Sequence, residues 1–368
     1  MKGKTLKTIA LAFAVGVILA PVVRAADLVE VQVDGQTRQF LCDIKEETYE
    51  YIRVEIEGEE REIPVARNGE RFVTTIKHGQ SPPNFAKAEM ARKNRQFQDA
   101  FELYKESFVS EAKNTAWLGP YIRFYAASAA FREAKYAQVK EEAKQEWYGR
   151  AADQWAKLME DHPKHYFVPR GTVGQARALM RLDRFTEARE ILEKVAGSDF
   201  PEWVKDEANV WEGRLLVEEG QLDEGISKLQ RLSEELMDTD KDLAYLAMLS
   251  QGYGWLKKGK GYADRAEDIF DKVGLLSPDD ELRAEAMNSR GLSLLNRGGP
   301  GNVREALLSF LRVVVLHHDI PHEHQRALYY AAKCSKDYYG PDTRFNELRK
   351  TLQTRYPKSE WTERVNKL

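Results

Sequence analysis

The stretch from Asp206 to Leu232 places the tightest constraint on the fold of this chain. Its first half repeats apolar and small residues every three to four positions, which predicts a helix with Gly213 on its packing face. Gly220 then stands where a left-handed residue commonly closes a helix. The second half has an apolar stripe of its own, at Ile226, Leu229 and Leu232. Because neither helix could bury its stripe alone, neighbouring copies of the hairpin must stack to close a core.

Variants of this hairpin, which keep its small and large positions, recur along the chain. The second helix of each copy has a small residue followed four positions later by a large one: Ala100/Tyr104, Ala151/Trp155, Ala188/Leu192, Gly225/Leu229, Ala266/Phe270 and Ala306/Phe310. Another small or apolar residue follows three positions further on: Ser107, Leu158, Val195, Leu232, Val273 and Val313. The matching small positions of the first helix are Ala88, Ala176, Gly213, Gly252 and Gly291.

This pattern resembles the tetratricopeptide repeat (TPR) over about three quarters of the chain, with closing prolines at Pro163 and Pro278. A seventh, partial copy is expected from Gln325 to Pro357. The resemblance implies a mainly α fold, a right-handed α-α superhelix whose first helices line a concave groove. The copies depart from the family, because their small positions are 51, 37, 37, 41 and 40 residues apart rather than 34. A generic helical-hairpin solenoid is therefore the alternative, and a long charged helix from Lys135 to Glu146 is expected to extend one copy.

Residues 26–78 have a different period. Apolar residues alternate there, as at Val29, Val31 and Val33, with the turn signals Asp34-Gly35 and Glu57-Gly58 between the runs. This predicts a small β module, a twisted sheet or an SH3-like barrel. By its pattern it resembles small β modules that precede repeat arrays in secreted bacterial proteins. Residues 79–83 contain two prolines and are expected as a linker, and residues 84–368 as the TPR-like array.

Residues 1–25 predict a secretory signal peptide. A basic start precedes the short apolar run from Ile9 to Leu19, and Val23-Arg24-Ala25 offers a cleavage site before Ala26. A membrane anchor is the alternative, although the run is shorter than the ~20 residues of a spanning helix. We therefore expect an exported protein, periplasmic or extracellular. Cleavage would remove four of the 56 basic residues and none of the 59 acidic ones, and the resulting net charge of −7 argues against a general nucleic-acid binder.

Motifs for catalysis or cofactors are incomplete. Gly254 to Gly261 matches most of a phosphate loop but lacks the Ser or Thr after the lysine, so we interpret it as a turn between helices. Gly298-Gly299-Pro300-Gly301 is expected as a turn insertion. Cys42 and Cys334 are far apart and are expected as small buried residues, with a bridge between them as the alternative. We therefore expect neither enzymatic turnover nor a cofactor.

Four of the seven histidines lie close together, at His317, His318, His322 and His324. Imidazoles crowded in this way are weak candidates for a zinc or copper site. Their spacing matches no standard zinc pattern, and Pro321 indicates a turn between helices. The interpretation that we favour is a solvated polar turn without a metal.

The resemblance places candidate partner-binding residues on the groove. If Ala176 is the small first-helix position, then Arg177 and Arg181 face the groove, with Arg170 and Arg184 near its rim. Arg214 is the equivalent of Arg177 in the next copy. Tyr253 and Leu256 are expected on the same side, where they would contact an apolar side chain, and the alternative is that they belong to the core. Guanidinium groups suit a carboxylate-bearing partner such as a peptide C-terminus. The alternative is an ordinary charged helix face with local ion pairs to Asp183 and Glu187.

Three functions are compatible with these features. The first is an exported scaffold that binds a protein or peptide through its helical groove. The second is an accessory subunit or enzyme whose chemistry, with or without a metal, lies in the β module or the histidine turn. The third is a structural protein of the cell envelope that contacts peptidoglycan or the outer membrane. The sequence leaves the identity of the partner and the oligomeric state open.

Overall fold

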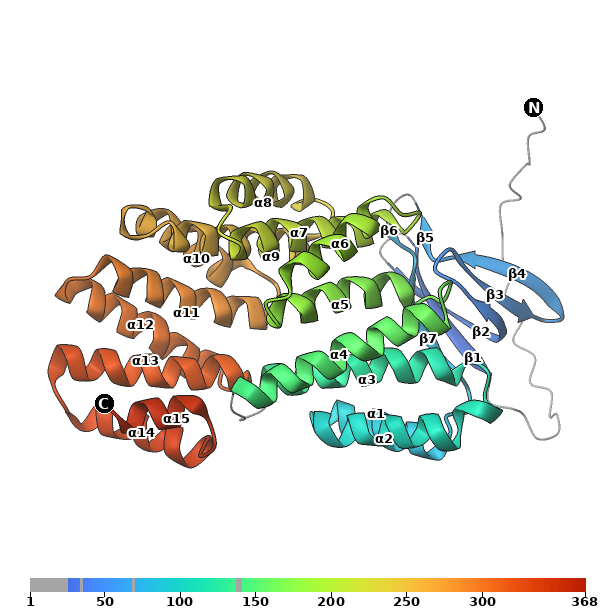
Figure 1. Ribbon diagram of the computed structural model, residues 1–368, viewed down its shortest axis with the longest axis horizontal. Helices are drawn as coiled ribbons and strands as arrows, with labels where there is room; N and C mark the ends of the chain where they lie inside the picture. The colour runs from blue at the N-terminus through green and yellow to red at the C-terminus, as the bar shows by residue number, and fades with distance from the viewer. Residues whose placement is uncertain (1–25, 34–35, 68–69, 137–140) are drawn as a thin grey trace.

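The computed structural model describes residues 26–33, 36–67, 70–136 and 141–368. The expected signal peptide and the Asp34-Gly35 turn therefore lie outside the described residues. The fold is a TPR-like helical array preceded by a small antiparallel sheet, as the sequence predicts (Figure 1). Among the described helices, none combines the length and the apolar composition needed to cross a membrane.

The N-terminal sheet is antiparallel, with the strand order β4-β3-β2-β1-β7, and β5 pairs with β6 in a separate ribbon. Its strands are β1 (Asp27–Val33), β2 (Gln36–Glu47), β3 (Tyr51–Ile56), β4 (Glu59–Pro64), β5 (Ala66–Arg67), β6 (Glu70–Arg71) and β7 (Val73–Lys77). Glu57 and Gly58 both have a positive φ, 54° and 81°, as a two-residue type I′ hairpin between β3 and β4 requires. Because β4 and β7 are edges of the five strands, the module is an open sheet and not a closed barrel.

Helices occupy the remainder of the described chain. They are α1 (Pro83–Lys93), α2 (Phe97–Ser110), α3 (Leu118–Tyr136), α4 (Glu141–Asp161), α5 (Val168–Arg181), α6 (Phe185–Ala196), α7 (Glu202–Glu218), α8 (Leu222–Leu236), α9 (Lys241–Lys257), α10 (Ala263–Leu276), α11 (Asp280–Arg297), α12 (Pro300–Leu316), α13 (Pro321–Tyr339), α14 (Thr343–Arg355) and α15 (Glu360–Asn366). The single helix expected from Lys135 to Glu146 is wrong, because α3 ends and α4 begins within it. The expectation that this copy is extended holds, since α3 has 19 residues and α4 has 21.

The repeat register is confirmed by the packing of small residues against large ones. All six small/large pairs of the second helices are buried. A Cβ atom added at Gly213 would lie 2.8 Å from Leu229 Cδ2, and one added at Gly291 would lie 2.5 Å from Phe310 Cζ. The absence of a side chain on the first helix therefore lets the large residue of the second helix approach its backbone.

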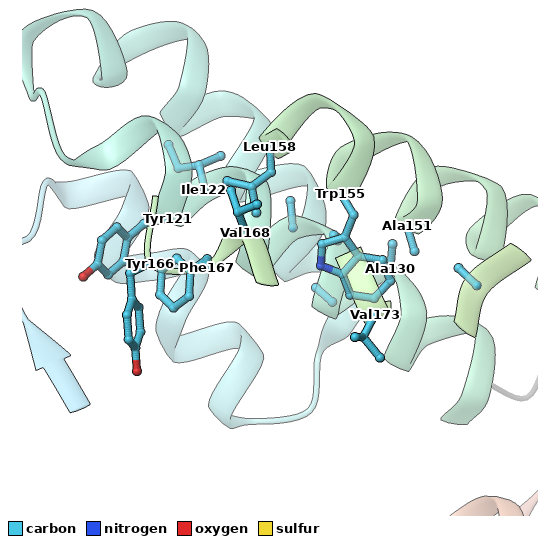
Figure 2. Packing of buried hydrophobic residues seen from close by; sticks show 14 of the residues in the cluster. Tyr121, Ile122, Ala130, Ala151, Trp155, Leu158, Tyr166, Phe167, Val168 and Val173 are labelled. Atoms are coloured by element: carbon cyan, nitrogen blue, oxygen red, sulfur yellow. The ribbon is translucent and has the colours of Figure 1, made fainter. Parts of the chain in front are cut away.

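Trp155 has the same role near the start of the array. Figure 2 shows its indole, carried by α4, close to Ala130 of α3 and Val173 of α5. A Cβ atom added at Gly174 would lie 2.8 Å from Trp155 Cε2, so only a glycine fits there without a shift of the indole. The hydrophobic core that contains Trp155 is continuous from the sheet to α7. The β module therefore shares its core with the first helices.

Two glycine-rich segments are turns only in part. The segment resembling a phosphate loop still belongs to α9 up to Lys257, and the expected turn between helices begins at Lys258, with a φ of 99° at Gly259 and a short 3-10 helix, Lys260–Tyr262, before α10. Gly298 and Gly299 also form a turn with positive φ, 78° and 88°. The expected turn insertion is nevertheless wrong in part, because Pro300 and Gly301 already form the first turn of α12, where proline is well suited.

Buried polar contacts join the sheet to the helices. The Nε2 atom of His78 lies 2.8 Å from Glu47 Oε1, and its Nδ1 atom lies 3.5 Å from Asp27 Oδ1. The hydroxyl of Tyr121 on α3 donates a hydrogen bond to Glu47 Oε2 at 2.7 Å, and the ring of His78 stacks on Trp117 at 4.0 Å. Burial opposes protonation of His78, but its hydrogen bonds to Asp27 and Glu47 outweigh burial and raise its pKa.

We expect His78 to stabilise the junction more at pH 6 than at pH 8.5. The pKa of His78 is higher in the folded state than in the unfolded state. Its contribution to stability is therefore fully present below the pKa of the unfolded state and is lost as the pH rises through the pKa of the folded state. His165 opposes this trend, because burial lowers its pKa to about 4. The measurement is therefore the difference in urea-unfolding free energy between the native chain and His78→Gln at both pH values. A difference that does not grow toward pH 6 would contradict the prediction.

Candidate functional site

The first helices of the copies form the inner layer of the array. Each of α5, α7, α9, α11 and α13 contacts the next, and each is joined to it through an intervening helix, so all five run in the same direction. They line a groove of about 1370 Å³, whose opposite wall is formed by α3 and α4. This volume exceeds that of a typical small-molecule pocket and suits a polymer segment.

Two helices provide most of the polar floor of the groove. On α5, Arg170, Arg177 and Arg181 line it. On α7, five residues at spacings of three and four form one face toward it: Trp203, Glu207, Trp211, Arg214 and Glu218. This spacing follows from the helical period, which returns a side chain to the same face every three to four residues. The groove chemistry is therefore encoded in two short stretches of sequence.

Arginine and tryptophan side chains stack on each other in the floor. The guanidinium carbon of Arg177 lies 4.5 Å from the ring centre of Trp211, and that of Arg214 lies 5.5 Å from it on a neighbouring turn. Arg177 is 3.6 Å from Glu207, and Arg214 is 3.9 Å from Glu285 of α11. Burial lowers the pKa of the Arg177 guanidinium, Glu207 opposes this, and the positive charges of Arg181 and Arg214 reinforce it. We call Arg177, Arg181 and Arg214 the arginine floor.

Arg181 differs from its neighbours because its guanidinium has neither a hydrogen bond nor an ion pair within the described part of the chain. Only its backbone carbonyl is used, as an acceptor for Gln145 Nε2 at 3.1 Å. Glu187, which the alternative reading assigned to the α5 arginines, pairs with Arg184 instead, and Arg184 does not line the groove. Burial lowers the pKa of Arg181, but Tyr148, Glu285 and Glu218 outweigh burial and raise it. Arg181 therefore presents to the groove a positive charge that makes no direct hydrogen bond or ion pair with a described residue.

Tyr253 and Leu256 of α9 are separated by the structure. Tyr253 lines the groove, and its hydroxyl donates to Glu285 Oε1 at 2.8 Å. Leu256 does not line the groove, so its predicted position is wrong. It packs instead against the buried cluster around Phe270, because the groove face of α9 continues four residues after Tyr253, at Lys257. Four of the five predicted residues thus lie on the groove, and their role in binding stays a prediction.

The tip of the α3–α4 hairpin closes the groove from the opposite side. Lys135 forms an ion pair with Glu281 of α11, and the hydroxyl of Tyr136 donates to Glu281 Oε2 at 2.8 Å. The ring of Tyr136 lies 4.9 Å from that of His322 on α13, and Lys144 pairs with Glu360 of α15 at 3.0 Å. In Figure 1 the first turn of α4 lies beside the start of α13. We call these contacts the clasp, and they join the first copies to the last.

The N-terminal ends of the inner helices are acidic. Asp206 of α7, Asp240 and Asp242 at the start of α9, and Asp279 at the start of α11 all line the groove. Asp240 and Asp279 cap their helices by accepting backbone N–H groups. Asp206 and Asp242 have neither a hydrogen bond nor an ion pair among the described residues. We call Asp206, Asp240, Asp242 and Asp279 the acidic rim.

The four clustered histidines do not converge. His324 is buried, with Nδ1 2.8 Å from the Tyr356 hydroxyl, whereas His322 faces Glu281 and the groove. His317 is also buried and His318 is exposed. The expected solvated turn is therefore wrong for three of them, because Pro321 begins α13 and turns their side chains into different contacts. Within the described ranges, no group of three or more His, Cys, Asp or Glu side chains is arranged to hold a metal ion.

The sequence interpretation missed Trp203, Trp211 and Glu285 as groove residues. The signal was present for the tryptophans, since Trp203, Trp211 and Arg214 share one face of α7 at helical spacing. Glu285 carried no signal of its own, because its importance comes from Arg214 and Tyr253 on two other helices. Cys42 and Cys334 are both free and buried, in separate hydrophobic clusters, so a bridge between them is absent.

The fold and the groove together define a TPR-like helical solenoid with a small N-terminal antiparallel sheet. Among solved structures, the chain is similar to a tetratricopeptide repeat protein from Parabacteroides merdae, at 14% identity and a TM-score of 0.47 over 77% of this chain and 97% of that one. It is also similar to PilW, a type IV pilus biogenesis factor, at 17% identity and a TM-score of 0.44 over 65% of this chain and 97% of that one.

A third similar structure is a monomeric mutant of IFIT1 with Gppp-AAAA. The identity is 11% and the TM-score 0.54, over 78% of this chain and 62% of that one. At this identity the likeness concerns the fold alone. No protein-family model and no curated protein sequence matches the chain.

Proposed function

We propose that this protein is an exported, non-enzymatic scaffold that binds a protein or peptide in the groove of its helical array. The observation that carries the proposal is the composition of the groove floor. Arginines and tryptophans are the residues most enriched where protein partners gain binding energy, and here they line one concave surface. Arg181 adds a charge that no described residue pairs, and a carboxylate of a partner would pair it with two parallel hydrogen bonds.

Binding is expected to fall by roughly tenfold or more, about 1.4 kcal/mol, in the double variant Arg177→Glu/Arg181→Glu. The two substitutions replace positive charges of the arginine floor with negative ones, which would repel a carboxylate of the partner. The measurement is the affinity for a partner, identified by photo-crosslinking from the Tyr253 position in envelope extract, together with circular dichroism to verify folding.

The matched control is Arg231→Glu/Arg312→Glu. Both arginines are exposed on the outer helices α8 and α12, and the change in net charge is the same. Its affinity is expected to stay within about twofold of the native value, because well-screened surface charges contribute little. If both double variants lost affinity equally, the change in net charge would explain the loss. That result would contradict binding in the groove.

Export is the second part of the proposal, and it is supported by the pattern of residues 1–25. We expect mass spectrometry of the protein from its native source to find an N-terminus at Ala26. An intact Met1 in a membrane fraction would instead indicate an anchored protein.

A further inference from the structure

The groove carries charges of both signs in comparable numbers. Among the described residues that line it, nine are lysine or arginine and twelve are aspartate or glutamate. A polymer of a single sign, whether polyanion or polycation, would therefore face like charges on much of the wall. Like charges brought together in a partly desolvated site are strongly unfavourable, so the wall selects against both.

The acidic rim and the arginine floor are separated along the inner helices, while Arg170 near the start of α5 and Glu218 at the end of α7 line the groove outside this arrangement. On α7, Asp206 lies near the N-terminal end and Arg214 lies eight residues later, about 12 Å further along the helix axis at 1.5 Å per residue. On α5, Arg177 and Arg181 occupy the C-terminal half, and on α9 Asp242 lies in the first turn. Because the inner helices run in one direction, the acidic rim follows one side of the groove and the arginine floor follows the other.

Both groups contain members that lack a partner of opposite charge. In the floor, Arg181 makes no direct ion pair among the described residues, and the Trp211 side chain, only 7% exposed, has an Nε1 donor that finds no hydrogen-bond acceptor among them. At the rim, burial raises the pKa of Asp242, and Asp240 and Asp279 raise it further. Burial likewise raises the pKa of Asp206, with added repulsion from Glu202 and Asp240. The floor therefore has N–H donors that could bind an acidic side chain, and the rim has carboxylates that could bind a basic one.

We propose that the groove recognises a bipolar segment of a partner protein, with an acidic side chain on the arginine floor and a basic side chain on the acidic rim. This inference rests on the proposed function and adds the charge pattern of the partner. An extended chain advances about 3.3 Å per residue, so a 12 Å separation corresponds to charges about three or four residues apart. The rings of Trp211 and Tyr253 lie 5.5 and 5.2 Å from the guanidinium carbon of Arg214 and line the floor, and they suit apolar residues between the two charges.

Synthetic fluorescent peptides test the pattern by anisotropy at low salt. The bipolar peptide has paired lysines and paired glutamates separated by about three apolar residues, the span derived above. Its controls are an all-glutamate peptide, an all-lysine peptide, and a peptide of identical composition with the two charge pairs adjacent. The bipolar peptide is expected to bind at least about tenfold more tightly than each control, since no control can satisfy both sides of the groove at once.

Two variants assign the two halves of the site. In Arg181→Glu, the bipolar peptide is expected to bind no more tightly than the all-lysine peptide. In Asp242→Lys, it is expected to bind no more tightly than the all-glutamate peptide. If the all-glutamate peptide binds the native protein as tightly as the bipolar one, the bipolar pattern is overturned while the proposed function stands. Binding of every peptide with equal affinity leads to the same conclusion. If no peptide binds at millimolar concentration, the proposed function fails, and the bipolar pattern with it.

Discussion

Gly213→Leu is expected to destabilise the array by about 1–3 kcal/mol, because overpacking a tight core forces side chains and backbone to shift. Even a single Cβ atom at this position would lie 2.8 Å from both Cδ2 and Cγ of Leu229. The neighbouring contact is equally tight, since a Cβ atom at Gly225 would lie 3.0 Å from the Gly213 carbonyl oxygen. Helices α7 and α8 would therefore have to separate. Urea unfolding monitored by circular dichroism measures the loss.

Gly301→Leu is the matched control for this change. Gly301 lies in the first turn of α12, and nothing lies within 4 Å of a Cβ atom added there. Its replacement is expected to be neutral or stabilising by up to about 1 kcal/mol, because glycine is a poor helix former. Leu229→Ala should partly rescue Gly213→Leu, since the inserted side chain would occupy the vacated space. Equal effects at Gly213 and Gly301 would show that the repeat register is wrong.

Glu281→Lys is expected to open the clasp between the first and the last copies. Glu281 accepts the Tyr136 hydroxyl, pairs with Lys135 and lies 3.2 Å from His322 Nε2. Burial raises the pKa of Glu281, but His322 and Lys135 outweigh burial and hold it well below its ordinary value. The pair is partly buried, with 27% of the Lys135 side chain and 29% of the Glu281 side chain exposed. Removing Glu281 is therefore expected to cost about 1–2 kcal/mol, less than for a fully buried pair. The reversal adds repulsion from Lys135.

Small-angle X-ray scattering is the measurement for the clasp. We expect a larger radius of gyration for Glu281→Lys, while helix content by circular dichroism stays unchanged, because the clasp joins copies that are each packed on their neighbours. Glu347→Lys is the control, since Glu347 is exposed on α14 and makes no ion pair within the described residues. Unchanged scattering for Glu281→Lys, with the fold intact, would mean that the clasp does not hold the first and last copies together.

Local patterns in the sequence were sufficient to predict the repeat and its register. Gly213 and Leu229 are sixteen residues apart within one hairpin, and their pairing follows from helical period and a short turn. The same holds for the placement of Arg177 and Arg214 on the groove, because a residue beside the small packing position of a first helix must face inward. Leu256 was misplaced because periodicity alone does not separate two positions three residues apart on one face.

Contacts between distant copies were decided by the tertiary structure alone. Lys135 and Glu281 are far apart in sequence, and only the curvature of the whole array brings the α3–α4 tip to α11. The shared core of sheet and helices and the His78 junction arise in the same way. Sequence by itself determined which residues pack within a hairpin, because that packing depends on local helical geometry. The shape of the groove and the partnering of its charges depend on the sum of small rotations between successive copies, and no single stretch of the chain encodes that sum.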